Sequence, residues 1–220
     1  MHSAIEQLNL IKNQVNNIVV KRQLKTHPEI IVVSKTFPLK NIIPLLKYGH
    51  IHYGENKVQE AEIKWKNIKN KFERLNLHLV GKLQTNKVKK ALSIFDYIHS
   101  LDNMKLANTI SKNQKDSKKK IKLFVQVNMG NESQKNGISA NKAVTFVKKC
   151  TNDLKLNIIG LMCLPPIDLN SEKYFKELYE LKNLCEVSHL SMGMSADYLI
   201  ATKYKSSFLR IGSSIFGPRN

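Results

Sequence analysis

The sequence predicts an α/β fold: a single (β/α)8 barrel of the TIM type with an extra N-terminal helix. Three observations lead to this prediction. Short apolar or β-branched runs recur at regular intervals, segments with helical spacing lie between them, and the first strand-to-helix turn has no glycine. The alternation is typical of a parallel sheet with crossover helices. The missing glycine disfavours an open dinucleotide-binding sheet, which needs a glycine-rich first turn.

Eight runs are expected to form strands. They cover residues 30–34, 50–53, 77–80, 97–99, 121–127, 156–160, 187–191 and 208–211. Helical spacing appears between them in residues 41–47, 58–69, 101–111, 141–150 and 172–185. A further helix, from about residue 5 to residue 22, precedes the first strand and is expected to pack outside or under the barrel. Eight βα units in 220 residues is close to the lower size limit of a closed barrel.

The chain is expected to form one domain, residues 1–220, with the N-terminal helix in 1–26 and the barrel in 30–217, because no linker rich in Pro, Gly or Ser divides it. Its composition, 42% hydrophobic and 7% aromatic, is that of an ordinary globular protein. We find no run long enough to span a membrane and no signal peptide. Three widely spaced cysteines argue against a disulfide framework or a zinc site, so we expect a reducing cytoplasm.

The net charge of +19 is large enough to raise the question of nucleic-acid binding. The lysines are spread along the chain, however, together with many Asn and Ile residues, and we therefore expect no nucleic-acid role. The one lysine-rich segment, residues 111–122, lies between a helix and the fifth strand. Such a connection belongs to the face of a barrel opposite its active site, and a solvated loop is expected there.

Functional residues of a barrel lie where its strands end. The loops after the last two strands, residues 191–195 and 210–214, both combine glycine with serine and are expected to bind a phosphate. Lys35 ends the first strand, across the mouth from these loops. If neighbouring apolar residues partly desolvate its amine, Lys35 could attack the carbonyl of a phosphorylated aldehyde. The alternative from position alone is a surface lysine in a lysine-rich chain.

Several segments together resemble the pyridoxal 5′-phosphate homeostasis proteins, which are similar to the N-terminal domain of bacterial alanine racemases. The matching segments are residues 32–36, 53–60, 78–87, 160–162, 190–195 and 210–217. They occur in the right order along nearly the whole chain. Residues 53–60, 83–87 and 191–195 are the most specific in combination.

The resemblance implies a barrel that binds pyridoxal 5′-phosphate as an internal aldimine. The implied cofactor-binding residues are Lys35, Asn56, Ser191, Ser195, Arg210, Gly212 and Ser213. In this assignment the lysine forms the Schiff base, the serines and the glycine hold the phosphate, and the asparagine lies beside the ring. The arginine points at the pyridine nitrogen, or alternatively serves as a second phosphate ligand. Because arginine is always a donor, it would keep that nitrogen unprotonated and the cofactor a weak electron sink.

The resemblance does not extend to the second domain of the racemases. The chain ends directly after the eighth unit, without the tyrosine that serves the racemases as a second base, and Tyr53 is expected to pack in its strand. We therefore expect an intracellular protein of pyridoxal phosphate homeostasis, a monomer that buffers the cofactor or delivers it to apo-enzymes without catalysis. The alternative is a pyridoxal phosphate-dependent amino-acid racemase or isomerase.

Three further side chains have open or modest roles. His78 precedes the loop after the third strand and is either near the cofactor or a satisfied core histidine. Cys163 follows the sixth strand and is expected to face the mouth, without a catalytic role. Trp65 is expected to be a packing residue of a helix or a loop.

Overall fold

A closed barrel of parallel strands forms the centre of the computed structural model, which describes residues 3–72, 74–115, 120–130, 132, 136–166 and 170–217. Within these residues eight strands close in the order β1-β2-β3-β4-β5-β7-β8-β9, and β9 pairs with β1. The barrel strands are β1 (Glu29–Val33), β2 (His52–Glu55), β3 (Asn76–Leu79), β4 (Tyr97–Leu101), β5 (Lys122–Asn128), β7 (Ile158–Cys163), β8 (His189–Ser191) and β9 (Phe208–Ile211). A two-residue strand, β6 (Ile138–Ser139), pairs with the end of β5.

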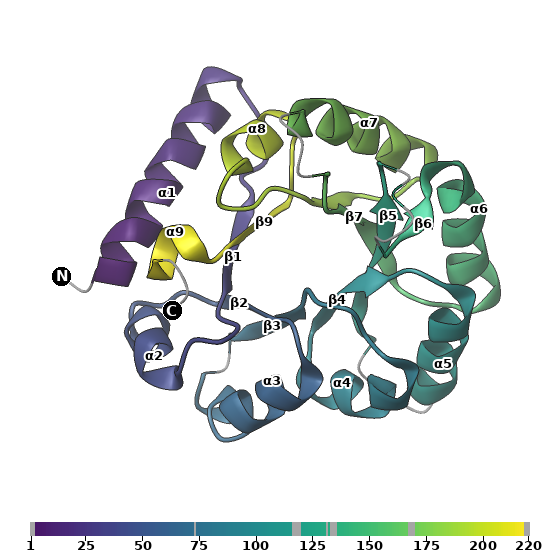
Figure 1. The fold of residues 1–220 in the computed structure, drawn as a ribbon, viewed down its shortest axis with the longest axis horizontal. Coiled ribbons are helices and arrows are strands. Elements are labelled where there is room, and N and C mark those ends of the chain that lie inside the picture. Colours follow the sequence, from purple (N-terminus) through teal and green to yellow (C-terminus); the bar gives the residue numbers. More distant parts are fainter. Residues whose placement is uncertain are drawn as a thin grey trace.

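Helices surround this barrel as an outer ring (Figure 1). They are α1 (Ser3–Lys21), α2 (Leu39–Lys47), α3 (Val58–Trp65), α4 (Val88–Ile94), α5 (Met104–Gln114), α6 (Ala143–Lys148), α7 (Ser171–Leu184), α8 (Tyr198–Lys203) and α9 (Ser213–Phe216). A π-helical turn, Lys149–Asp153, continues α6. None of the described helices is long and apolar enough to cross a membrane.

The N-terminal helix α1 packs on the outside of the barrel, as expected. Its buried stripe recurs at the three- and four-residue spacing of one helix face and consists of Ala4, Leu8, Ile11, Val15 and Val19. The helix contacts α2, α8 and α9. In Figure 1 it lies between α8 and α2 in the ring, beside the short yellow α9. The first helix of the chain thus completes the helical layer.

Side chains alternate between the inside and the outside of the barrel, as in any strand. The inner core contains Ile31, Tyr97, Phe124, Met162 and Phe208, whereas the intervening residues pack under the helices. The same alternation, continued past the strand end, puts residue 35 on the inward side of β1. Residue 210, two positions after an inner residue of β9, also belongs to the inside.

The expected eight-stranded barrel is confirmed, with strand ends shifted by a few residues. The largest shift is at β7, which runs to Cys163 rather than ending at Gly160. Three short helices that were not specified from the sequence, α4, α8 and α9, complete the ring. The lysine-rich connection is described only in part, because residues 116–119 lie outside the described residues. Its solvated-loop assignment stays a prediction.

Candidate functional site

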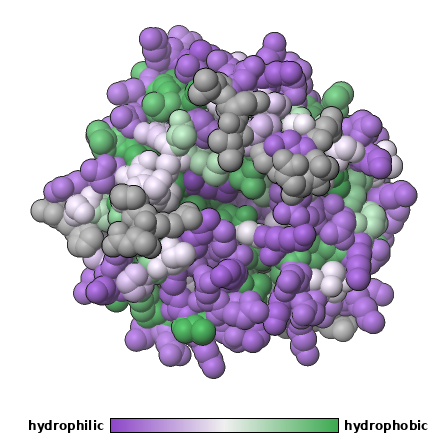
Figure 2. Space-filling view, in the orientation of Figure 1, coloured by the Kyte–Doolittle hydropathy of each residue, from purple (hydrophilic) through white to green (hydrophobic). Residues whose placement is uncertain are grey.

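The residues expected at the site follow four of the strand ends. Lys35 comes after β1, Asn56 after β2, Ser195 in the loop after β8, and Gly212 and Ser213 directly after β9. Because parallel strands end on one face, these residues lie around one mouth. Figure 2 shows that the molecule is hollowed near the centre of one face, over the strands of Figure 1, with a largely hydrophilic rim.

A cluster of buried polar groups fixes the end of the first strand. The Ser34 hydroxyl donates to Glu55 Oε1 at 2.7 Å, and Lys64 Nζ donates to the same oxygen at 2.8 Å and to the Ser34 carbonyl at 2.7 Å. The indole of Trp65 donates to Glu55 Oε1 at 3.1 Å. The Glu55 side chain is 0% and the Lys64 side chain 12% exposed, so the charges are paired away from water. The cluster ties the residues that precede Lys35 and Asn56 to α3.

The turn after β1 is also attached to the last helix. Lys35 is half-buried, and the next residue, Thr36, has a positive φ of 68°. The ring of Phe37 stacks on the ring of Phe216 in α9, with 4.5 Å between centroids. The lysine turn therefore lies beside the loop that follows β9.

Glycines allow the loops to approach one another closely. A Cβ on Gly81 would lie 2.3 Å from the carbonyl oxygen of Asn56, so the backbone after β3 rests on the backbone after β2. Gly193, after β8, has a φ of +91°, and a Cβ there would lie 2.5 Å from the Cβ of Ala201. A side chain on Gly81 would push the loops after β2 and β3 apart, and one on Gly193 would push the loop after β8 away from α8.

The two serine-containing loops are joined by hydrogen bonds. The Arg210 N–H donates to the Gly193 carbonyl at 2.9 Å, and the Ser214 N–H donates to Ser195 Oγ at 3.3 Å. A Cβ on Gly212 would lie 3.2 Å from the Val33 carbonyl oxygen, which brings this loop against the end of β1. Serine hydroxyls and backbone N–H groups thus gather beside the strand that carries Lys35.

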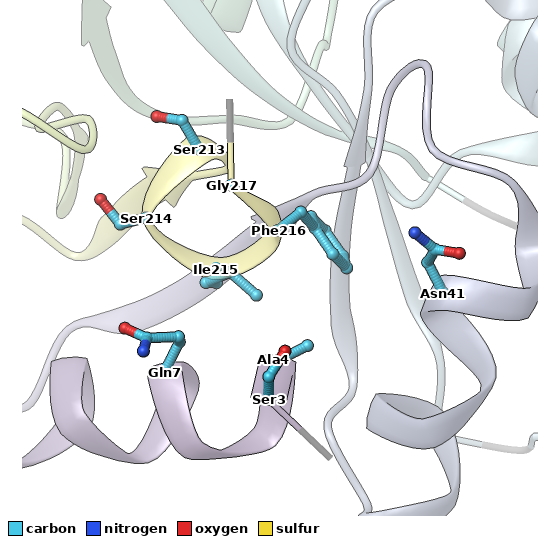
Figure 3. A pocket seen from close by; sticks show the side chains of 9 residues that line it. All are labelled: Ser3, Ala4, Gln7, Asn41, Ser213, Ser214, Ile215, Phe216 and Gly217. Carbon is cyan, nitrogen blue, oxygen red and sulfur yellow. The ribbon is translucent and has the colours of Figure 1, made fainter. Parts of the chain in front are cut away.

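A hollow of about 430 Å³ lies between α9 and the first residues of α1 and α2. It is lined by Ser3, Ala4, Gln7, Asn41 and residues 213–217. Figure 3 shows the side chains of Gln7 and Ser3 on α1 beneath α9, while the hydroxyls of Ser213 and Ser214 point away from α1. The hydroxyls of Ser213 and Ser214 are therefore directed away from the α1 side of the hollow, although both residues line it.

Arg210 is held inside the barrel by three acceptors. Its Nη1 donates to the carbonyl and to the hydroxyl of Ser191, each at 2.6 Å, and its Nη2 donates to the Cys163 carbonyl at 2.8 Å. Burial lowers the pKa of the guanidinium, while Cys163 and Asp197 raise it. Ser191 is fully buried and its hydroxyl also contacts His99 Nδ1 at 2.8 Å. Ser191 therefore supports Arg210. The phosphate role predicted for Ser191 would require its hydroxyl, which already contacts Arg210 and His99.

The remaining sequence expectations have mixed outcomes. His78 is a core histidine: it is fully buried, and both ring nitrogens contact other histidines. Tyr53 is buried against Trp65, with 5.2 Å between ring centroids, so both are packing residues.

Cys163 was expected to face the mouth, and this was wrong. As β7 continues past Gly160, the inner position is Met162, the Cys163 thiol lies in the outer core, and burial raises its pKa to about 12.

The mouth combines an amine, a set of anion donors and a fixed cation. The described residues contain no group of three or more His, Cys, Asp or Glu side chains that could hold a metal ion. An amine next to hydroxyl and backbone N–H donors suits a ligand that has both a carbonyl and a phosphate. The sequence reasoning missed the Glu55–Lys64 pair and the histidine contacts, which depend on the facing of side chains in neighbouring elements.

Comparisons with known proteins agree with this geometry. Residues 8–220 match the family model described as Alanine racemase, N-terminal domain. The chain is 34% identical to the pyridoxal phosphate homeostasis protein of Pasteurella multocida, over 98% of this chain and 98% of that protein. It is 31% identical to the homeostasis protein of Haemophilus influenzae, over 97% of this chain and 94% of that protein.

A solved structure of PipY from Synechococcus elongatus with PLP bound is similar along its whole length. It is 28% identical, with a TM-score of 0.77, over 92% of this chain and 100% of that chain. The family match and the identities over nearly full lengths lead to one conclusion. The chain belongs to the family of the alanine racemase N-terminal domain and, within it, to the pyridoxal phosphate homeostasis proteins.

Proposed function

We propose that this protein binds pyridoxal 5′-phosphate at the barrel mouth through Lys35 and buffers it or delivers it to apo-enzymes. One observation carries the proposal. The residue before Lys35 is fixed by Glu55 and Lys64, and the Gly212 loop packs so closely against the same strand end that a Cβ on Gly212 would lie 3.2 Å from the Val33 carbonyl oxygen. An amine and an anion-binding loop are thereby kept together.

The residues present fit the cofactor's three chemical parts. When bound, it supplies an aldehyde carbonyl, a phosphate and a pyridine ring that accepts electrons. Lys35 would bind the carbonyl carbon covalently, while Ser195, Ser213 and the backbone of Gly212 would hold the phosphate. Asn56 would lie beside the ring and Arg210 would donate to its nitrogen.

The fixed arginine favours a carrier over a catalyst. A guanidinium donates hydrogen bonds and does not accept protons, so it would leave the ring nitrogen without a proton and the ring a poor acceptor of carbanion electrons. A racemase also needs an acid and a base on opposite faces of the substrate carbon. Tyr53, the tyrosine nearest to a strand end, is buried against Trp65 and does not serve this purpose. The three unpaired cysteines are in keeping with a reducing compartment such as the cytoplasm.

Transfer of the cofactor is the direct test. The protein is loaded with pyridoxal phosphate, freed of excess, and mixed with an apo-aminotransferase. We expect the acceptor to regain activity in proportion to the cofactor loaded. In a parallel sample in heavy water, L-amino acids should show no α-proton exchange above that of the Lys35→Ala variant. An acceptor that stays inactive for hours would contradict the carrier role, and fast exchange that depends on Lys35 would favour the racemase alternative.

Replacing Gly212 tests the phosphate loop. A valine there would press its branched side chain against the Val33 carbonyl and move the backbone N–H groups of the loop, so we expect affinity for pyridoxal phosphate to fall at least about tenfold. Gly212→Ala, which adds one methyl group at the same contact, should have a much smaller effect. Affinity is measured by absorbance titration, and urea unfolding checks that both variants are folded. A valine variant with unchanged affinity would mean that the phosphate binds elsewhere.

A further inference from the structure

Three histidines meet end to end inside the barrel, on the neighbouring strands β2, β3 and β4. His52 Nδ1 lies 2.9 Å from His78 Nε2, and His78 Nδ1 lies 2.9 Å from His99 Nε2. All three rings are buried, with exposures of 6%, 0% and 0% in that order. Beyond His99, the contacts continue through the Ser191 hydroxyl to Arg210, as described above. The line therefore runs from the floor of the barrel to a residue of the mouth.

The spacing identifies the contacts as hydrogen bonds. Two imidazole nitrogens on one tetrahedral zinc ion, each about 2.0–2.1 Å from the metal, would lie roughly 3.3 Å apart. The observed 2.9 Å is instead the usual length of an N–H···N bond. Each ring must then donate from one nitrogen and accept at the other, which a neutral imidazole does.

The charged groups at the two ends fix the direction of the chain. Arg210 can only donate, so Ser191 Oγ accepts from it. Among the described residues His99 Nδ1 is the acceptor within reach of the single serine hydrogen, so Ser191 donates to His99 Nδ1. His99 then donates from Nε2 to His78, and His78 from Nε2 to His52. The last N–H, at His52 Nε2, points toward the Glu29 carboxylate, 3.8 Å away. The reverse direction would set a lone pair of His52 against that carboxylate.

Stacked rings keep the histidines in line. Tyr97 stacks on His78 with 4.2 Å between centroids, and Phe124 stacks on His99 with 4.4 Å. Burial, together with the neighbouring positive charge of Arg210, lowers the pKa of His99. Burial is also the largest cause of the lowered pKa of His78, followed by the neighbouring histidines. An extra proton on either ring would set two N–H groups against each other.

We propose that His52, His78 and His99 are positioning residues for the cofactor: a directed chain of neutral, Nε2-protonated imidazoles that orients Ser191 as an acceptor and so holds the Arg210 guanidinium in place. The proposal rests on the proposed role of Arg210 at the cofactor ring. Among the residues that the structure describes, the other titratable or charged groups near the chain of histidines are Glu29, His50, Tyr97, Lys122 and His189. None of these lies between His52 and Arg210 in the line of hydrogen bonds.

The first arm of the test needs no variant and no cofactor. The full chain, freed of cofactor and labelled with ¹⁵N-histidine, is examined by long-range ¹⁵N–¹H NMR at neutral pH. We expect His52, His78 and His99 to be neutral and protonated at Nε2. A charged ring, or an Nδ1-protonated tautomer in any of the three, would overturn the proposal.

The second arm compares three variants. His99→Phe keeps the stacked ring but removes both bonds, and His99→Asn keeps an oxygen that can accept from Ser191. His189→Phe is the matched control, since His189 lies inside the same barrel, outside the line. We expect affinity for pyridoxal phosphate to fall about tenfold in His99→Phe, less in His99→Asn and not in His189→Phe. The visible absorption band of the loaded protein should shift in His99→Phe.

The two proposals fail in distinguishable ways. A wild-type protein that forms no reducible adduct at Lys35 would overturn the proposed function, whatever the tautomers. A wild-type protein that forms the adduct, with His99→Phe folded and unchanged in both affinity and absorption band, would overturn the positioning role alone. Equal losses in His99→Phe and His189→Phe would mean that only general core packing is involved, which also overturns it.

Discussion

Replacing Lys35 with alanine is expected to abolish covalent attachment of pyridoxal phosphate while the barrel stays folded. Lys35 lies in the turn after β1, is only half-buried and belongs to neither core cluster. Removing its side chain should therefore change the free energy of unfolding little. The amine, in contrast, is the nucleophile of the proposed site. After borohydride reduction, peptide mapping by mass spectrometry should find the pyridoxyl group on Lys35 in the wild type and nowhere in the variant. Affinity should fall roughly a hundredfold, leaving cofactor held through its phosphate.

Two control variants make this result specific. Lys35→Arg keeps the positive charge but cannot bind the aldehyde, and it should behave like alanine. Lys82→Ala removes an exposed lysine from the loop after β3, where Nζ donates to Asn136 Oδ1 at 2.7 Å, and it should keep full labelling. If Lys35→Ala kept its reducible adduct, another lysine would be the attachment site and the assignment of β1 would be wrong.

We expect acid to unfold the protein at a higher pH than protonation of its carboxylates alone would require. Burial lowers the pKa of His50 to about 3, and the pKa values of His52, His78 and His99 are lowered as well, mainly by burial. In the unfolded chain these histidines bind protons as the pH falls below about 6.5, whereas in the folded protein they stay neutral. The free energy of unfolding is therefore highest above pH 6.5 and decreases as the pH falls toward the lowered pKa values of the folded state. Each histidine contributes a slope of about 1.4 kcal/mol per pH unit in this window.

The combined effect is large compared with the stability of a domain. The three histidines with the largest lowering of pKa, His50, His78 and His99, together give about 4 kcal/mol per pH unit, against a total stability of about 5–15 kcal/mol, so unfolding is expected between about pH 5.5 and 3. Urea titrations at several pH values measure this. His50→Gln, whose amide can still donate to the His52 carbonyl, should lower the slope by about 1.4 kcal/mol per pH unit. His27→Gln, at an exposed site, should not change it, and equal slopes in all three proteins would contradict the prediction.

Local sequence predicted the strands and the loops of the mouth well, because each depends on a short run. Apolar runs marked the eight strands, and the serine and glycine residues of 191–195 and 210–214 marked loops that the structure joins. Cys163 was misplaced because a strand end was put three residues early. Side chains of a strand point alternately to its two faces, so an error in where the strand ends or how it continues can assign a side chain to the wrong face.

Contacts between elements could not be read in the same way. His52, His78 and His99 all lay in or beside predicted strands, but their meeting requires the relative registers of three strands, and no single run contains that information. In the structure, His52 is opposite Asn76 and His78 is opposite Tyr97. The pair of Glu55 and Lys64 likewise joins the outward face of a strand to a helix. Buried polar groups of this kind follow from the assembled fold rather than from its segments.

The place of α1 in the ring has a consequence for folding during synthesis. The helix is made first, yet two of its partners, α8 and α9, are made last. The part of its apolar stripe that α8 and α9 cover must therefore stay exposed to solvent, or be bound by other proteins, until nearly 200 further residues have been synthesised, whereas α2 follows within about 25 residues. The β1–β9 pairing that closes the barrel is equally non-local. Since non-local contacts form slowly, we expect docking of α1 and closure of the barrel to coincide as a late step, in which the mouth itself is completed.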